Sequence, residues 1–368
     1  MAIKKITIEE FIELTDKYPV IDVRSPGEFA HAHIPGAFSM SLFTDEERKV
    51  VGTLYKQESR ETAIKKGLEY FGLKMVKCVE EAEMIANEFV KKHKDTEGSK
   101  TLLVHCWRGG MRSAGVAWLL DLYGFKVYTL AGGYKAFRQW VLAQFTKEYF
   151  FKIIGGYTGS GKTEVLSHIQ KQGALAIDLE GLASHKGSAF GAINMPPQPG
   201  QEMFENMLAL ELKEKSTDTA LQPDNGQTKP IYLEDESQRI GLVNIPNGIW
   251  KQMRLQPVLF LQIPFEERLQ HITTGYGKCD NEKLINAIIR IKKRLGGIET
   301  KMAVNHLLED NTTEAFRILL TYYDRMYKKG LEKRPDWQML FSEIIFEKID
   351  AAAMAKQILL QETIQTNA

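Results

Sequence analysis

One eight-residue segment constrains the fold of this chain more than any other feature. Residues 156–163 read Gly-Tyr-Thr-Gly-Ser-Gly-Lys-Thr and match the pattern G-x-x-x-x-G-K-[ST] of a phosphate-binding loop, or P-loop. The apolar run at 150–154 predicts a strand before the loop, and residues 162–172 predict a helix after it. Because such a loop joins a buried strand to a helix N-terminus, the segment predicts an α/β domain with a phosphate site at the sheet edge.

The side chains and backbone of this loop predict how it binds phosphate. The candidate phosphate-binding residues are Gly156, Gly159, Ser160, Gly161, Lys162 and Thr163. Backbone N–H groups surround phosphate oxygens, Lys162 neutralises the terminal ones, and the Thr163 hydroxyl is a candidate ligand for Mg²⁺. The pattern leaves open which phosphate or diphosphate compound binds.

Two acidic residues are predicted to join this site. Asp178 lies at the end of the strand predicted at 174–179, where small-molecule kinases of this class often hold a carboxylate; alternatively it caps the following loop. Glu234 follows the strand predicted at 231–233 and is a candidate for holding a metal or orienting water. The acids at 234–236 are clustered, unlike the lone Asp of a common Walker B strand, so the pattern leaves nucleotide hydrolysis open.

A cysteine loop forms the second candidate site. Cys106 follows the strand predicted at 101–105 and precedes the helix predicted at 113–123. A lowered pKa of the Cys106 thiol is predicted from the helix N-terminus and from the nearby Arg108 and Arg112. The glycines at 109–110 let backbone N–H groups point at a sulfur or an anion. Cysteine, five residues and arginine is also the spacing of cysteine phosphatases. A sulfur carrier, a phosphatase and an inert structural turn therefore stay open.

Length and composition favour two globular domains. With 368 residues, 48 basic and 47 acidic side chains and 43% hydrophobic residues, the chain has an ordinary globular composition rather than that of a polyanion-binding tail. Alternating strands and helices predict one parallel-sheet domain at 1–147 and a second domain at 148–368. Residues 215–230 predict an exposed loop, and the pattern from residue 281 onward predicts almost only helices.

The sequence also carries signals about compartment. Three cysteines without paired spacing predict neither a disulfide framework nor a zinc site. No apolar run approaches the roughly 18 residues that cross a bilayer, and the first residues lack the apolar region of a signal peptide. These patterns predict a cytoplasmic protein that does not use a membrane.

Motifs on both sides of the cysteine loop resemble the rhodanese family. They are Val-Ile-Asp-Val-Arg-Ser-Pro-Gly-Glu-Phe at 20–29, His-Ile-Pro-Gly-Ala at 33–37 and Leu-Ala-Gly-Gly-Tyr at 130–134. The resemblance implies a cysteine that carries sulfur as a persulfide, although cell-cycle dual-specificity phosphatases share this fold. The loop is one residue longer than in ordinary rhodaneses, which suggests that it admits a phosphate-bearing chalcogen donor. Asp22 and Arg24 are expected to form a buried structural pair.

The whole combination resembles the bacterial tRNA 2-selenouridine synthases. Besides the two loops it includes Asp-Leu-Glu-Gly-Leu-Ala-Ser-His-Lys-Gly-Ser at 178–188 and Leu-Glu-Asp-Glu-Ser at 233–237. The resemblance implies a rhodanese-like parallel-sheet domain followed by a P-loop NTPase-like α/β domain with a helical C-terminal region. It implies a selenotransferase and geranyltransferase that converts wobble 2-thiouridine in tRNA to 2-selenouridine, with selenophosphate and geranyl diphosphate as co-substrates, through an S-geranylated intermediate.

This resemblance also suggests roles and partners. Cys106, with Arg108 and Arg112, becomes the catalytic site for selenium transfer, while Lys162 and Thr163 hold a diphosphate. The candidate tRNA-binding residues are Arg290, Lys292, Lys293 and Arg294. Such a basic cluster suits RNA, but it is also common on a solvated helix face. An enzyme that produces selenophosphate is a further expected partner; no tightly bound cofactor is expected, and Mg²⁺ stays open.

Three other functions stay open at this point. A rhodanese-kinase fusion that phosphorylates a small molecule predicts ATP turnover without RNA. A rhodanese-fold cysteine phosphatase predicts hydrolysis of an aryl phosphate that depends on Arg112. A non-catalytic tRNA-binding module predicts that Cys106→Ser leaves function intact.

Overall fold

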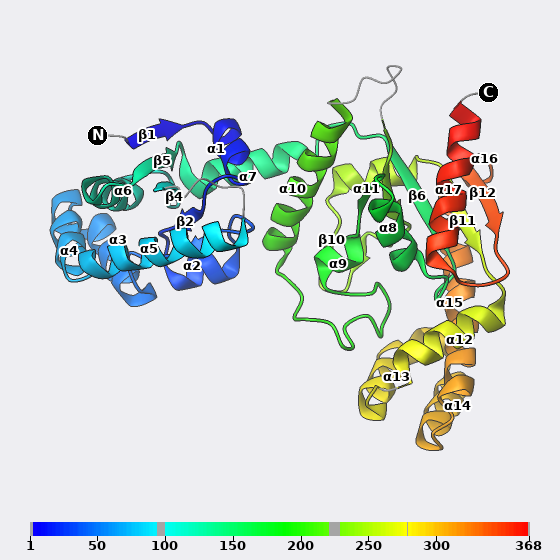
Figure 1. Ribbon diagram of the computed structural model, residues 1–368. Coiled ribbons are helices and arrows are strands. Elements are labelled where there is room, and N and C mark those ends of the chain that lie inside the picture. The colour runs from blue at the N-terminus through cyan, green and yellow to red at the C-terminus, as the bar shows by residue number, and fades with distance from the viewer. Residues whose placement is uncertain (1–2, 94–99, 221–228, 278, 367–368) are drawn as a thin grey trace. The chain divides into compact units, whose positions relative to one another are not determined.

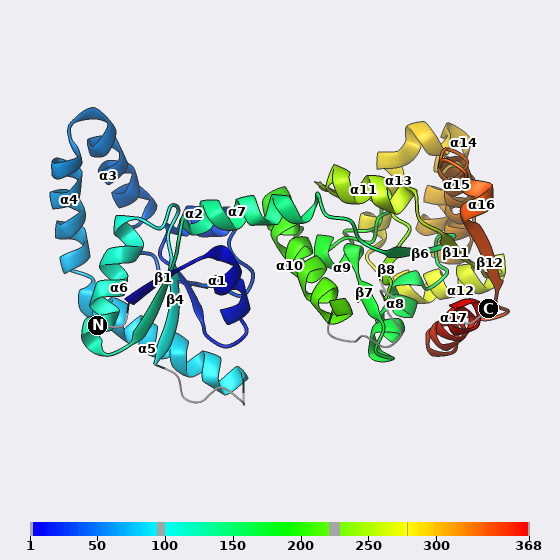
Figure 2. The same cartoon turned by 90° about the horizontal axis from the view of Figure 1, so that it is seen from above.

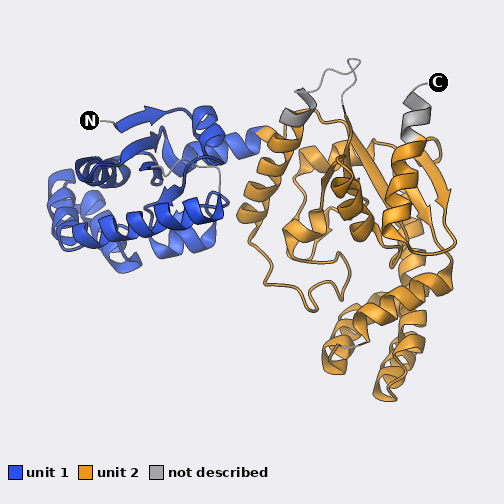
Figure 3. Cartoon of the chain, viewed as in Figure 1, with its two compact units in different colours: residues 1–143 blue, residues 144–368 orange. Residues whose placement is uncertain are grey.

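The computed structural model describes residues 3–93, 100–220, 229–277 and 279–366. It divides into two compact units, Met1–Ala143 and Gln144–Ala368 (Figure 3). The sequence-based boundary near residue 147 lies just after this division. Both units are α/β with parallel sheets, which confirms the predicted fold class. Within the described ranges, no helix has the length and apolar character that a bilayer crossing requires.

Unit 1 is built on a parallel sheet with the strand order β1-β5-β4-β2-β3 (Figure 1). The strands are β1 Ile3–Ile6, β2 Val20–Asp22, β3 Phe38–Ser39, β4 Thr101–His105 and β5 Lys126–Leu130. Every residue of the central strand β4 is buried, as expected for a parallel strand covered on both faces. The strands predicted at 101–105 and 126–130 are confirmed residue for residue.

Helices enclose the core of unit 1. They are α1 Ile8–Leu14, α2 Pro26–His31, α3 Asp45–Gln57, α4 Arg60–Gly72, α5 Met75–Lys92, α6 Met111–Tyr123 and α7 Gly133–Gln144. The core joins Ile21 and Val104 of the sheet to Val116 of α6, and Cys106 belongs to the same cluster. Helices α3 and α4 pack side by side as a hairpin (Figure 2). Cys106 is therefore anchored by core packing as well as by its loop.

The sheet of unit 2 places the P-loop strand at its centre, in the order β12-β11-β6-β8-β7. The parallel strands are β6 Phe151–Gly156, β7 Leu175–Ile177, β8 Ile231–Glu234, β11 Val258–Gln262 and β12 Phe341–Ile345, and a small antiparallel pair is formed by β9 Arg239–Ile240 and β10 Val243–Asn244. The prediction of almost only helices after residue 281 is confirmed for the described residues apart from β12. This strand pairs with β11 from Val258 and Phe341 onward, so long-range backbone hydrogen bonding overrides the local pattern.

Two groups of helices surround this sheet. The helices are α8 Lys162–Lys171, α9 Leu179–Ala183, α10 Gln201–Ala220, α11 Asn247–Arg254, α12 Phe265–Tyr276, α13 Asn281–Leu295, α14 Gly297–Leu308, α15 Thr312–Leu331, α16 Trp337–Leu340 and α17 Ala351–Thr366. Helices α8 and α17 pack together on the sheet through Ile169 and Ile358. Helices α12 to α15 form a second cluster (Figure 1).

The loop predicted at 215–230 is wrong for its first part, because α10 continues to Ala220. Phe204, Leu208 and Leu212 of α10 are fully buried, so packing stabilises this helix beyond what its polar last turns predict. The part of the prediction at 221–228 lies outside the described residues.

Candidate functional site

The P-loop joins β6 to α8, as the sequence predicts. Gly156, Gly159 and Gly161 adopt φ values of 152°, 84° and 75°, in the region that favours glycine. A Cβ atom on Gly159 would lie 2.8 Å from Cδ1 of Ile272, so the loop backbone is too close to its neighbour for a side chain. Lys162 donates from Nζ to the Gly156 carbonyl at 2.9 Å. The lysine is thus held over the backbone that would surround a phosphate.

The two hydroxyl groups of the loop have different surroundings. Ser160 Oγ is buried and has no hydrogen-bond partner among the described residues, so it can donate to a ligand. Thr163 Oγ1 donates to Oε2 of Glu180 at 3.0 Å. The described part of the chain holds no group of three His, Cys, Asp or Glu side chains that suits a metal ion. Mg²⁺ at Thr163 stays a prediction.

Four carboxyl groups gather on the Lys162 side of the loop: Asp178, Glu180, Glu234 and Glu236. Glu234 is fully buried, and its Oε1 accepts from the Glu180 N–H at 2.8 Å. Burial, followed by the charges of Asp178 and Glu180, raises the pKa of Glu234 well above its usual value. Burial and the neighbouring Glu180 likewise raise the pKa of Glu236. The group can therefore hold or accept protons next to a cationic lysine.

Sequence reasoning found two of these acids and missed the other two. Asp178 caps α9, since its carboxylate accepts from the Gly181 N–H at 2.7 Å, and it also lines the cavity beside the loop. Glu180 and Glu236 were missed. The clustered acids at 234–236 and the Leu-Glu-Gly segment at 179–181 are the sequence signals that point to them.

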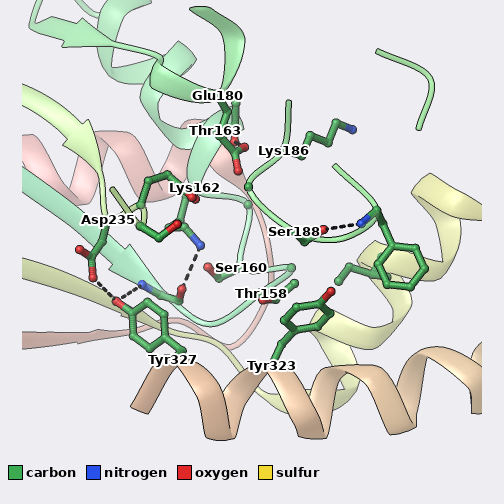
Figure 4. A pocket seen from close by; sticks show the side chains of 18 of the residues that line it. Thr158, Ser160, Lys162, Thr163, Glu180, Lys186, Ser188, Asp235, Tyr323 and Tyr327 are labelled. Carbon is green, nitrogen blue, oxygen red and sulfur yellow. Dashed lines mark hydrogen bonds between the residues drawn. The ribbon is translucent and has the colours of Figure 1, made fainter. Parts of the chain in front are cut away.

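A cavity of about 1270 Å³ opens beside the P-loop. Figure 4 shows Lys162 between two sides of this cavity: Asp235 and Tyr327 lie on one side, and Tyr323 and Ser188 lie on the other. The Tyr323 side also carries a group of apolar and aromatic side chains. It is lined by Phe190, Ile272, Tyr276, Phe316, Leu319 and Leu320. These side chains come from the segment after α9 and from α12 and α15, so their meeting depends on the tertiary fold.

The four predicted tRNA-binding residues lie on the last turns of α13. Of these described side chains, Arg294 alone lines the cavity. Arg290 donates to the Ala189 carbonyl at 3.2 Å, while Lys292 and Lys293 are exposed. The cluster is thus a solvated basic helix end that also reaches the cavity.

The cysteine loop joins β4 to α6 and surrounds a buried thiol. Cys106 is 3% exposed, and its Sγ lies 3.2 Å from Oγ of Ser113. Burial raises the pKa of the Cys106 thiol, but the Ser113 hydroxyl and the backbone N–H groups of Ser113, Gly110 and Arg108 outweigh it, and the pKa is lowered. Gly109 has a φ of 61°, which turns the backbone. The predicted ring of N–H groups around the sulfur is present.

The Arg112 guanidinium carries an ion pair that the sequence did not reveal. Its Nη1 donates to Oε2 of Glu28 at 2.8 Å. Burial acts to raise the pKa of Glu28, but Arg112, the Ser25 N–H and Arg48 overcome it and lower the pKa to about 2. Glu28 is therefore ionised at neutral pH and is not suited to be the general acid that a phosphatase needs.

Asp22 and Arg24 form the expected structural pair. Arg24 Nε and Nη2 donate to Asp22 Oδ2 at 2.9 and 2.6 Å, and Nη2 also donates to the Ala32 carbonyl at 2.7 Å. The Arg24 guanidinium lies 3.8 Å from the centre of the Tyr134 ring. Trp107 is exposed, with its ring centre 5.7 Å from that of Tyr134. The buried pair therefore links β2 to the next turn and supports the floor of the cysteine loop.

The fold and the two loops define a class of protein in which a rhodanese-like unit is joined to a P-loop unit. A model of the rhodanese-like domain matches residues 7–139, and a model described as the tRNA 2-selenouridine synthase AAA domain matches residues 150–355. The chain belongs to the tRNA 2-selenouridine synthase family, and it is an enzyme of tRNA modification.

Curated relatives agree over most of the chain. The tRNA 2-selenouridine synthase of Sulfurovum sp. (strain NBC37-1) is 35% identical, with 86% of this chain and 89% of the relative covered. The protein of the same name from Cupriavidus pinatubonensis is 33% identical over 86% and 89%. That of Psychromonas ingrahamii is 32% identical over 87% and 90%.

Proposed function

We propose that this enzyme converts wobble 2-thiouridine in tRNA to 2-selenouridine with selenophosphate, through an S-geranylated intermediate made with geranyl diphosphate. One observation carries the proposal: the P-loop and an apolar wall line the same cavity in unit 2. A ligand with a diphosphate head and a branched hydrocarbon tail complements both parts. Burying a hydrocarbon tail contributes about 0.8 kcal/mol per methylene group, so the apolar part of the cavity lining favours such a tail over a polar group.

In the first step, the C2 sulfur of the nucleobase attacks C1 of the geranyl group. The C1–O bond breaks and diphosphate leaves with the electron pair, while the N3 proton of the base is lost. Lys162 and the loop N–H groups are placed to stabilise the charge that develops on the leaving group. Burial raises the pKa values of Glu234 and Glu236 well above their usual value, which makes these carboxyl groups stronger proton acceptors than ordinary carboxylates.

In the second step, the selenium of selenophosphate adds to C2 of the base, and the C2–S bond breaks so that geranyl thiol leaves with a proton. Water then attacks the phosphorus, the P–Se bond breaks, phosphate is released and the selenium stays on C2. Geranyl thiolate is a better leaving group than the unmodified sulfur of a thiocarbonyl. Geranylation would therefore activate C2 of the base for substitution. The Cys106 loop, with its inward N–H groups and Arg108 and Arg112, is proposed to hold the anionic selenium donor. An upstream enzyme that makes selenophosphate supplies this donor, and Arg290, Lys292, Lys293 and Arg294 are proposed to meet the tRNA backbone.

The alternative hypothesis of a rhodanese-kinase fusion agrees less well with the lining of the cavity. A kinase for a small polar acceptor would leave the apolar side chains on the Tyr323 side of the cavity without a matching part of the ligand. For the phosphatase alternative, Glu28 is not a suitable general acid, because Arg112 holds it ionised.

The test is mass spectrometry of tRNA nucleosides after purified protein is incubated with thiolated tRNA, geranyl diphosphate and selenophosphate. We expect geranylated 2-thiouridine without selenophosphate and 2-selenouridine when both co-substrates are present. Absence of both products under conditions in which the tRNA binds would overturn the proposal. ATP replaces geranyl diphosphate in a parallel reaction, and ATP turnover without RNA would instead favour the kinase.

A further inference from the structure

The side of the cavity opposite the apolar wall has a different chemistry. Asp235 and Tyr327 lie there (Figure 4), and Trp250, Arg254 and Lys333 line the same cavity. Trp250 and Arg254 are partly exposed, and Lys333 is exposed. This side therefore combines one flat aromatic surface with two cations that belong neither to the P-loop nor to the apolar wall.

A hydrogen-bond network holds this side rigidly against the P-loop. The Tyr327 hydroxyl donates to Oδ2 of Asp235 at 2.7 Å and accepts from the Gly156 N–H at 3.4 Å. Nη2 of the buried Arg334 donates to Oδ1 of Asp235 at 3.0 Å. A ligand on this side would thus be positioned relative to the phosphate-binding backbone.

Trp250 and Arg254 are arranged as a pair on one helix. They are four residues apart on α11 and so share a face. The Arg254 guanidinium lies 5.4 Å from the centre of the Trp250 ring, and Nη2 donates to the Gly330 carbonyl at 3.2 Å. The guanidinium is thereby fixed over the indole ring, and its other N–H groups stay available as donors.

We propose that Trp250 and Arg254 form the binding site for the target nucleoside of the tRNA, with the Trp250 indole stacked on the pyrimidine ring and Arg254 and Lys333 on the flanking phosphates. The inference rests on the proposed function, because the sulfur must approach C1 where the diphosphate and the apolar wall meet. The apolar wall holds the hydrocarbon, which leaves the opposite side for a flat polar ring. Single unpaired bases are bound by stacking on aromatic side chains in this way.

The two cations favour RNA over a mononucleotide as the occupant. All phosphates of a mononucleotide would lie in the P-loop, which has its own Lys162. A nucleoside within RNA carries a phosphate on either side of its base, and these phosphates need cations outside the loop. Arg254 and Lys333 are cations of that kind.

The experiment measures binding of an anticodon stem-loop with 2-thiouridine at the wobble position to the full-length protein, without geranyl diphosphate. We expect Trp250→Ala to weaken binding by about tenfold, the usual loss of one stacked base, and Trp250→Phe to stay within about threefold of the parent. Trp337→Ala is the matched control, because Trp337 does not line the cavity, and it should bind as the parent does. Circular dichroism confirms that each variant is folded.

Salt dependence tests the arginine separately. Arg254→Gln should make the slope of log affinity against log salt concentration less steep by about one, the change expected when one phosphate contact is lost. Arg317→Gln is the control, since Arg317 is already paired with Glu266 and Glu314 and should leave the slope unchanged. Two results would overturn the inference: a Kd for the stem-loop that is unchanged in Trp250→Ala, or a Trp250→Ala variant that loses ATP binding while it still binds the stem-loop. If the wild-type protein binds the stem-loop through Trp250 yet forms no geranylated product, the proposed function fails while the nucleoside site stands.

Discussion

The two glycine-rich loops of this enzyme are built alike and serve different purposes. Each connects a buried parallel strand to the N-terminus of a helix and directs backbone N–H groups inward. In unit 1 the groups surround Cys106, which is 3% exposed, and Arg112 is already paired with Glu28. In unit 2 the loop opens into a cavity of about 1270 Å³. The same local geometry thus surrounds a buried sulfur in one unit and borders a large cavity in the other.

The comparison predicts that the two loops can be disabled independently. Cys106→Ser removes the thiol at the centre of the loop that is proposed to hold the selenium donor, so formation of 2-selenouridine should be lost while geranylated 2-thiouridine accumulates. Nucleoside mass spectrometry measures both products in one sample. Cys279→Ser is the matched control, because Cys279 lies in unit 2 outside both loops, and it should behave as the parent does. Normal selenation by Cys106→Ser would remove the catalytic role of the thiol.

Lys162→Ala should have the reciprocal effect. Removing a group that stabilises a developing anion typically costs on the order of 10²–10³ in rate, so we expect geranyl transfer to fall by at least about 100-fold. The reactivity of the Cys106 thiol in unit 1 should be unchanged. Lys356→Ala, an exposed position on α17, serves as the control. Geranylation at the parental rate would contradict the role of the P-loop.

Glu28→Gln tests the ion pair that distinguishes the cysteine loop. The pKa of Glu28 is lowered from 4.5 to about 2 in the folded protein, so its stabilisation is complete above pH 4.5 and is lost as the pH falls toward 2. The variant should lose about 2 kcal/mol of unit 1 stability at pH 7 and less at pH 3. Hydrogen exchange of the β4 amides, measured in the full chain at increasing urea concentrations, gives the free energy of unfolding of unit 1 for the parent and the variant at each pH. An equal loss at both pH values would argue against the ion pair as its source.

The smallest expected effect concerns the hydrogen bond to the sulfur. Ser113→Ala removes the hydroxyl that lowers the pKa of Cys106, and a hydrogen bond to a charged group is worth about 1.5–3 kcal/mol. We expect the pKa of Cys106 to rise by about one unit. The ultraviolet absorbance of the thiolate, measured against pH, follows the titration of Cys106. The absorbance of the Cys106→Ser variant is subtracted as the background. If the titration curve does not move, the backbone N–H groups alone stabilise the thiolate.

The sequence predicted the parts of both loops that depend on near neighbours. Short motifs predicted the P-loop, the strands at 101–105 and 126–130, the lowered pKa of Cys106 and the Asp22–Arg24 pair. These features could be predicted because a few adjacent residues set backbone turns and strand ends. Conversely, the helix through Ala220 and the strand β12 contradicted local patterns. Burial of one helix face and pairing with β11 decided these two elements, and neither contact is visible in a local window.

Only the tertiary structure decided what surrounds each loop. Glu28 and Arg112 are 84 residues apart, and Arg268 reaches Asp324 across 56 residues, so such pairs form only when distant segments pack. The apolar wall likewise joins Phe190 to α12 and α15. Sequence alone predicted a thiolate site in one unit and a phosphate site in the other, since both predictions rest on contiguous motifs. The shape and polarity of each ligand space came from long-range packing, because a cavity is lined by residues that share space rather than sequence.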